Sequence, residues 1–196
     1  MTLKIEDIKK HTGQFEGTFE HMYLDTEGYV TVAVGNKLES AADAQQLDFV
    51  VRHTRQKASA AQIAADFEAV SNQPKGLLAS KYAAHTKLML QSAVMDALFD
   101  RRIRAFESDL RRIYRGYDGF PYEVRLALLD LAYNLGSYAL EHRWPSLNAD
   151  IASCNWARAA GSCHRRGVPE DRNEWTKQQF ESAARVTSQQ SVGSGV

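Results

Sequence analysis

The segment FEGTFEHMYLDTEGYVTVAVG, residues 15–35, decides the fold because its hydrophobic period changes from helical to extended partway along. Around its start, mostly apolar side chains recur at spacings of three and four, as on one face of an amphipathic helix: Ile5, Ile8, Thr12, Phe15 and Phe19. Gly17 is a natural helix stop. From Tyr23 onward the period is two, and the β-branched residues in 29–34 predict a strand. We therefore expect a helix followed by a β-hairpin.

Three polar side chains of this segment stand where they could do chemistry. Glu16 falls at the expected helix end, where the helix dipole and neighbouring phenylalanines disfavour its charged form, as a general acid requires. Asp25 opens the turn 25–28, where its carboxylate can accept hydrogen bonds from turn amides. Thr31 shares a strand face with Tyr29, away from the valines. Taken singly, each also has an ordinary interpretation as a helix-end, turn or strand residue.

Composition bounds the class of protein. A chain of 196 residues with 44% hydrophobic residues can bury a core as one domain or two small lobes. Lys+Arg and Asp+Glu number 24 each, so no overall field attracts nucleic acid or a membrane surface. No apolar run approaches the ~18 residues that a membrane span needs.

The cysteines do not indicate a metal site. Cys154 and Cys163 are nine positions apart, and His164 follows, but no further Cys or His cluster completes a tetrahedral zinc set. We expect two ordinary thiols, with a disulfide as the alternative in an oxidising compartment.

The rest of the chain is expected to be mainly helical. The predicted helices are one capped by Ser40 with Leu47, Val50, Val51 and Thr54 as its apolar stripe, one from Ser59 with Ile63, Phe67 and Val70 inward, and then 92–114, 122–135, 147–154, 155–160 and 174–186. Residues 72–76 break the chain. Residues 122–135 are the most hydrophobic, so they should form the buried centre of the larger part of the fold.

Residues 16–35 resemble the active-site segment of the phage T4-type lysozymes, glycoside hydrolase family 24. The resemblance is carried by Glu16-Gly17, Tyr23, Asp25-Thr26-Glu27-Gly28-Tyr29, Thr31 and Gly35. Glu16 precedes Asp25 by nine positions and Asp25 precedes Thr31 by six, which are the separations of the family's catalytic set. The resemblance therefore implies that Glu16, Asp25 and Thr31 are catalytic.

Two positions depart from the family pattern. Ala33 stands where the family usually has the first glycine of a Thr-x-Gly-x-Gly run, and Asn36 stands where it often has histidine. We expect Asn36 to supply a different polar contact behind the site, with Tyr29 as a further supporting residue.

Two residues near the C-terminal end are also supporting candidates. Arg172 lies in a segment that resembles the family's late Gly-x(4)-Arg, in which the arginine pairs with the catalytic glutamate. The resemblance thus implies a pairing of Arg172 with Glu16. Asn134 stands where the family has a polar side chain that lines the substrate cleft, but it could equally cap its helix. Both interpretations of Asn134 stay open.

The implied fold is α+β, mostly α: a lysozyme-like fold with a small lobe carrying the β-hairpin and a larger helical lobe joined by a long helix. Residues 1–196 would form one such domain. The small lobe would span 1–91, the linking helix and helical lobe 92–187, and a flexible tail 188–196. Residues 37–91 are longer than the family's small lobe needs, and we interpret them as a helical elaboration that shapes one wall of the cleft.

The implied activity is that of a muramidase, which hydrolyses the β-1,4 bond between N-acetylmuramic acid and N-acetylglucosamine with inversion of configuration. Glu16 would protonate the leaving oxygen, Asp25 would orient or deprotonate the attacking water, and Thr31 would hold that water. Neither metal nor cofactor is required. Two other functions stay open: a fold that binds glycan without turnover, and a helical interaction or delivery domain in which Glu16 and Asp25 are only structural.

The expected partner is the glycan strand of peptidoglycan, bound by a monomer. The N-terminal residues lack the apolar core of a signal peptide, so we expect synthesis in the cytoplasm. The enzyme would then reach the periplasmic cell wall through a phage-encoded pore or a secretion system. As an injected bacterial toxin it would imply a neutralising immunity protein, and the choice between toxin and phage endolysin stays open.

Overall fold

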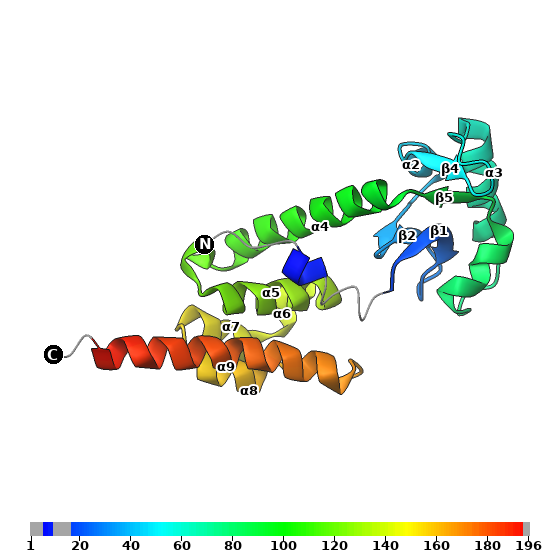
Figure 1. Ribbon diagram of the computed structural model, residues 1–196. Coiled ribbons are helices and arrows are strands. Elements are labelled where there is room, and N and C mark those ends of the chain that lie inside the picture. Colours follow the sequence, from blue (N-terminus) through cyan, green and yellow to red (C-terminus); the bar gives the residue numbers. More distant parts are fainter. Residues whose placement is uncertain (1–5, 10–16, 194–196) are drawn as a thin grey trace. The chain divides into compact units, whose positions relative to one another are not determined.

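The computed structural model describes residues 6–9 and 17–193, and it divides into two compact units (Figure 1). We call Gly13–Arg101 the N-terminal unit, and Met1–Thr12 with Arg102–Val196 the C-terminal unit. The architecture is α+β and mostly helical, with small antiparallel sheets followed by helices, as the sequence predicted at that level of detail.

The N-terminal unit contains both sheets found in the described part of the chain, one three-stranded in the order β1-β2-β3 and one two-stranded, β4-β5. Its elements are β1 (Phe19–Leu24), β2 (Val30–Ala33), β3 (Asn36–Lys37), α2 (Ala41–Ala44), β4 (Phe49–Val51), α3 (Ala60–Ser71), η1 (Ala79–His85) and β5 (Leu88–Leu90). The strands β3, β4 and β5 were not predicted.

The β1–β2 hairpin is confirmed, and backbone hydrogen bonds close its turn. The Asp25 amide donates to the Tyr29 carbonyl at 3.0 Å, and the Gly28 amide donates to the Asp25 carbonyl at 3.0 Å. Gly28 has a φ of 91°, a conformation that residues with a β-carbon resist. The antiparallel register places Tyr23 opposite Thr31.

The prediction that Phe19 belongs to the first helical face is wrong. Phe19 is the first residue of β1 and pairs with Ala33 of β2. Its ring lies 5.1 Å from the ring of Tyr23, centroid to centroid. An aromatic residue suits a strand, and pairing with β2 outweighs the helical period. Residues 6–9 are helical, whereas residues 10–16 lie outside the described chain.

The core of the N-terminal unit forms around β2, which is buried along its whole length. α3, η1 and β5 all contact β1, so the three-stranded sheet is covered by the chain that follows it. The buried cluster comprises Met22, Tyr23, Leu24, Val30, Val32, Ala33, Leu38, Ala44, Phe49, Ala58, Ile63, Val70, Tyr82, Leu88, Leu90 and Leu98. Residues 37–91 therefore supply much of the packing for the hairpin, and they are not purely helical.

The helix expected from Ser40 is much shorter than predicted. The Ser40 hydroxyl does cap it, accepting the Asp43 amide, but α2 ends at Ala44. The predicted apolar stripe runs instead into β4, which pairs with β5. The physical reason is that three consecutive β-branched or aromatic residues, 49–51, favour a strand once a partner strand is present.

By contrast, α3 begins where the sequence predicted. The Ser59 hydroxyl accepts the Gln62 amide while the Gln62 side chain accepts the Ser59 amide. This reciprocal capping satisfies two amides that the first helical turn leaves without partners. The inward positions Ile63 and Val70 are buried, as expected.

The C-terminal unit is helical, and its boundary with the N-terminal unit falls inside α4. Its elements are α4 (Ser92–Ile113), η2 (Tyr117–Gly119), α5 (Tyr122–Leu135), α6 (Ser137–Arg143), α7 (Pro145–Ala152), α8 (Trp156–Ser162) and α9 (Glu170–Gly193). α9 runs alongside α8 and α5 (Figure 1). α5 has the predicted bounds and is almost entirely buried, as is Trp156.

α9 differs from its prediction at both ends. It begins at Glu170, so Arg172 lies in its first turn and not in a connecting segment. At the other end it continues to Gly193, through residues that were expected to form a flexible tail. Residues 194–196 lie outside the described chain.

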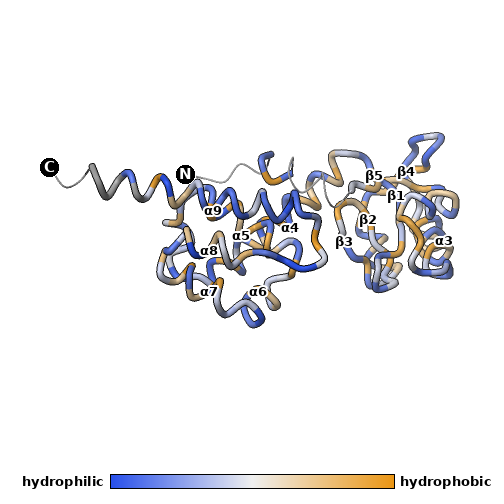
Figure 2. Tube along the Cα trace, turned by 90° about the horizontal axis from the view of Figure 1, so that it is seen from below, coloured by the Kyte–Doolittle hydropathy of each residue, from blue (hydrophilic) through white to orange (hydrophobic). Residues whose placement is uncertain are grey.

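Two basic residues near the end of α4 form ion pairs. Arg111 pairs with Asp118 at 2.9 Å and Arg112 with Glu141 at 2.9 Å, with all four side chains partly exposed. Figure 2 shows hydrophilic residues recurring along α4 between hydrophobic ones. No helix in the described residues is both long and apolar enough to span a membrane.

Ala33, the last residue of β2, has a left-handed backbone conformation, which is strained for a residue with a β-carbon. It has a φ of 55° and is 1% exposed. A left-handed conformation costs a residue with a β-carbon about 1–2 kcal/mol, whereas burial of the methyl group contributes about 0.8 kcal/mol. Because the two terms nearly cancel, we predict that Ala33→Gly changes the free energy of unfolding by less than about 1 kcal/mol. Hydrogen exchange of the β1–β2 amides would measure the change.

Ala44 is the matched control, because it is equally buried but lies in a helix of the same unit. Ala44→Gly removes the same methyl group without relieving strain, so it should destabilise the unit by about 1.5–2 kcal/mol. If both substitutions lower the free energy of unfolding equally, the backbone at Ala33 is not strained.

Candidate functional site

The Asp25 carboxylate is held by the backbone of its own turn. Its Oδ1 accepts the Glu27 amide at 3.0 Å and the Tyr29 amide at 2.8 Å. Its Oδ2 lies 3.4 Å from Oγ1 of Thr31. One oxygen is therefore engaged by two fixed donors, while the other faces a hydroxyl on the next strand. The side chain is half-buried, so solvent can reach it.

Thr31 is fixed by β2 and is only 2% exposed. Its Oγ1 lies 3.1 Å from the Tyr29 carbonyl oxygen as well as 3.4 Å from the Asp25 carboxylate. A hydroxyl has one proton, so Thr31 donates to one of these acceptors at a time. Its oxygen can accept a further hydrogen bond in either case. The fold thus brings together Asp25 and Thr31, two of the three residues predicted to be catalytic.

The other predicted residues of this segment lie in different settings. Tyr29 is 48% exposed, and the Lys37 ammonium lies 3.3 Å from the centre of its ring. Asn36 begins β3 and pairs through its backbone with Val32. Glu16, the predicted acid, lies outside the described residues.

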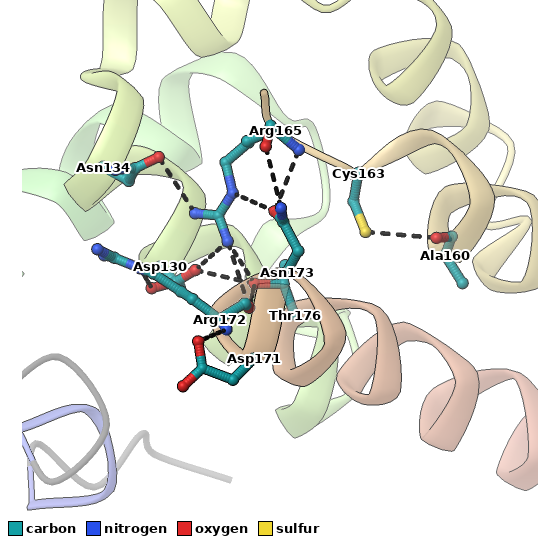
Figure 3. A network of polar contacts seen from close by, with 9 residues as sticks. All are labelled: Asp130, Asn134, Ala160, Cys163, Arg165, Asp171, Arg172, Asn173 and Thr176. Carbon is teal, nitrogen blue, oxygen red and sulfur yellow. Dashed lines mark hydrogen bonds and ion pairs between the residues drawn. The ribbon is translucent and has the colours of Figure 1, made fainter. Parts of the chain in front are cut away.

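A second polar cluster, which we call the Asp130 network, lies in the C-terminal unit (Figure 3). Arg172 donates from Nε to Asp130 Oδ1 at 2.9 Å, and Arg165 Nη2 lies 2.8 Å from Asp130 Oδ2. None of the three residues is more than 3% exposed. One buried carboxylate therefore faces two guanidinium groups, and the cost of burying these charges depends on that pairing.

Neutral side chains complete the Asp130 network. Thr176 donates to Asp130 Oδ2 at 2.9 Å, while the Asn173 side chain accepts from both the amide and Nε of Arg165. Figure 3 shows these groups converging on Asp130 and Arg165 from α5, α9 and the segment between α8 and α9. These contacts fix the start of α9 against α5.

Asn134 belongs to the edge of this network. Its Oδ1 accepts from Nη1 of Arg165 at 3.4 Å. Gly136, not Asn134, closes the helix, with its amide donating to the Ala132 carbonyl at 2.9 Å and a φ of 80°. The capping interpretation of Asn134 is therefore wrong, and a role toward substrate stays a prediction.

The predicted pairing of Arg172 with Glu16 also stays a prediction, because Glu16 lies outside the described residues. What the structure establishes for Arg172 is an ion pair with Asp130. That partner was missed in the sequence because Asp130 lies within a long apolar run and is 42 positions from Arg172. A charged residue inside such a run was the available signal, since a buried charge requires a partner.

The two cysteines differ in their surroundings. Both are free thiols; Cys154 is exposed, and burial raises the pKa of the Cys163 thiol to about 11. Among the described residues, no three His, Cys, Asp or Glu side chains gather as metal ligands would.

Comparison of the chain with models of protein families finds no matching family, and comparison with curated proteins finds no significant match.

The Asp130 network makes a strong prediction for stability. Asp130→Asn leaves two buried guanidinium groups without their carboxylate, so we expect the free energy of unfolding to fall by about 3–5 kcal/mol. The three tryptophans, Trp144, Trp156 and Trp175, all lie in the C-terminal unit, so their fluorescence during urea unfolding reports on it.

Asp118→Asn is the matched control, because Asp118 also pairs with an arginine but is 65% exposed. This substitution should lower the free energy of unfolding by less than about 1 kcal/mol. Similar effects of the two substitutions would mean that the Asp130 network contributes no more than a surface ion pair.

Proposed function

We propose that the protein is a muramidase that cleaves the β-1,4 bond between N-acetylmuramic acid and N-acetylglucosamine with inversion of configuration. The observation that carries the proposal is the Asp25 carboxylate, fixed through Oδ1 by two turn amides and facing the Thr31 hydroxyl through Oδ2. The resemblance of residues 16–35 to the T4-type lysozyme segment supports it.

In the proposed reaction, a water molecule bound to Asp25 Oδ2 attacks the anomeric carbon from the face opposite the leaving group. Asp25 takes a proton from that water as the new carbon–oxygen bond forms. Glu16 gives its proton to the glycosidic oxygen as the old bond breaks. An inverting enzyme requires the two carboxyl groups to stand about 6.5–9.5 Å apart, so that the water fits between them.

The burial of Thr31 limits the role that it can play. Only 2% of its surface is exposed, so Thr31 cannot be the sole group that holds the attacking water. It can fix the orientation of Asp25 and accept one hydrogen bond from a water that Asp25 holds. We therefore assign Thr31 to positioning both the base and the water.

The first prediction for the enzyme concerns the two carboxyl groups. Asp25→Asn keeps an oxygen that can accept the turn amides, so the hairpin should persist while the base is lost. Glu16→Gln removes the acid. Each should lower cleavage by at least roughly a hundred-fold, measured as new reducing ends released from purified peptidoglycan.

Asp48→Asn is the control for removing an acidic group from the same unit, because Asp48 is 72% exposed and pairs only with an exposed lysine in the described contacts. It should leave cleavage unchanged. Substantial cleavage by Asp25→Asn or Glu16→Gln would remove that residue from its role. Binding of peptidoglycan by the unaltered protein without any release of reducing ends would favour a glycan-binding function instead.

A second prediction concerns stereochemistry. Thr31→Glu places a carboxylate where the attacking water is held, so the variant should form a covalent glycosyl-enzyme. Mass spectrometry after incubation with peptidoglycan would detect the adduct. Thr31→Gln has the same size without the charge and should form none. If both variants are folded and neither is modified, Thr31 does not adjoin the anomeric carbon.

A further inference from the structure

We propose that Lys37 forms a carboxylate-binding subsite beside the Asp25–Thr31 pair, which binds the acidic substituent of the muramyl residue. This inference rests on the proposed muramidase function, and it names the part of the substrate that the N-terminal unit recognises. It follows from three observations on Lys37: its register in the sheet, its contact with Tyr29 and its weak pairing with Glu39.

The register of β3 places Lys37 next to the proposed site. Lys37 is the direct cross-strand neighbour of Thr31 on β2. Side chains that face each other across an antiparallel pair lie on the same side of the sheet, about 4.5–5.5 Å apart at their β-carbons. Tyr29, two positions before Thr31, lies on that side too. One sheet face thus carries Thr31, Tyr29 and Lys37.

The aromatic ring of Tyr29 positions the ammonium group of Lys37. The Nζ atom lies 3.3 Å from the ring centre, which is a close cation–π contact. Lys37 is 39% exposed and Tyr29 48% exposed, so the pair faces solvent and is not core packing. The ring restricts a flexible side chain, and an ammonium over one ring still has N–H groups to donate elsewhere.

The acidic partner that Lys37 has within the protein is weakly held. Glu39 Oε1 lies 3.8 Å from Nζ, and the Glu39 side chain is 80% exposed. An ion pair this long and this exposed contributes little. A carboxylate on a bound substrate can therefore replace Glu39 at small cost, with a shorter and less solvated contact.

The chemistry of the proposed substrate supplies such a carboxylate. N-acetylglucosamine is neutral, whereas N-acetylmuramic acid bears a lactyl ether that ends in a carboxyl group. In the intact wall this carboxyl group is joined to a peptide stem as an amide and carries no charge, but the stem has carboxylates of its own; without the stem, the lactyl carboxylate is free. Either source offers an anion on the muramyl side of the bond, and a lysine binds both as a point charge.

The test combines variants of Lys37 with substrates of different charge. Lys37→Gln removes the charge, Lys37→Arg keeps it, and Lys57→Gln removes an exposed lysine that pairs with Asp48 elsewhere in the unit. The substrates are native peptidoglycan, peptidoglycan with methyl-esterified carboxylates, and glycan strands stripped of peptide by an amidase. Rates are measured as reducing ends, with kcat and KM separated.

We expect Lys37→Gln to raise KM for native peptidoglycan by roughly three-fold to ten-fold, with kcat nearly unchanged. Esterification should raise KM by a similar factor for the unaltered protein but not for Lys37→Gln, because both changes remove the same contact. Lys37→Arg should have a KM close to that of the unaltered protein, because it keeps the charge. Lys57→Gln should also leave KM unchanged. An effect confined to intact peptidoglycan identifies the stem carboxylates as the anion, and an effect that also appears on stripped strands, where the lactyl carboxylate is free, shows that the subsite binds either group.

Two negative outcomes are distinguishable. If the unaltered protein cleaves peptidoglycan but Lys37→Gln responds to esterification as fully as the unaltered protein does, the carboxylate subsite is wrong and the muramidase proposal stands. If the unaltered protein releases no reducing ends from any of the three substrates, the muramidase proposal fails, and the assignment of Lys37 fails with it.

Discussion

The arrangement of the candidate site depends on the hydrogen bonds between the Asp25 carboxylate and the amides of its own turn. These bonds, together with the positive φ of Gly28, fix the length of the turn and hence the register of β1 on β2. A slip of one residue would move Thr31 to the opposite face of the sheet and put a valine in its place. The interactions that stabilise the turn therefore also determine which side chain stands beside the carboxylate.

A comparison of Asp25 with Asp130 shows why the first is the better candidate for chemistry. Both are aspartates held by several hydrogen bonds, but the Asp130 oxygens contact Arg172, Arg165 and Thr176 and are 2% exposed with the rest of the residue. Asp130 thus holds α5 and α9 together. Asp25 is half-buried, and its Oδ2 faces a single described hydroxyl at 3.4 Å, so a water molecule can reach it.

Several features that depend on neighbouring residues could be predicted from the sequence. The turn at Asp25, the capping of α3 by Ser59 and the bounds of α5 all arise from adjacent side chains, and all three were predicted. The bounds of α9 and the cap that ends α5 are local features that were predicted wrongly. Two other failures required a distant partner. Residues 49–51 become β4 only because β5 lies beside them, and Asp130 is tolerated in a buried helix only because two arginines from later in the chain reach it. The Asp25–Thr31 contact was predictable because six residues and one turn separate the two.

The same sheet geometry has a consequence for how substrate recognition would couple to the reaction. Thr31 and Lys37 are joined by the pairing of β2 with β3, and Thr31 and Asp25 by the β1–β2 hairpin, so no hinge separates the proposed carboxylate subsite from the proposed base. In an enzyme of this design, a muramyl carboxylate held at Lys37 would fix the sugar relative to Asp25 without any moving part. Orientation supplied in this way lowers the entropic part of the barrier. In such an enzyme, the three-stranded sheet β1-β2-β3 would combine the choice of sugar with the placement of the attacking water.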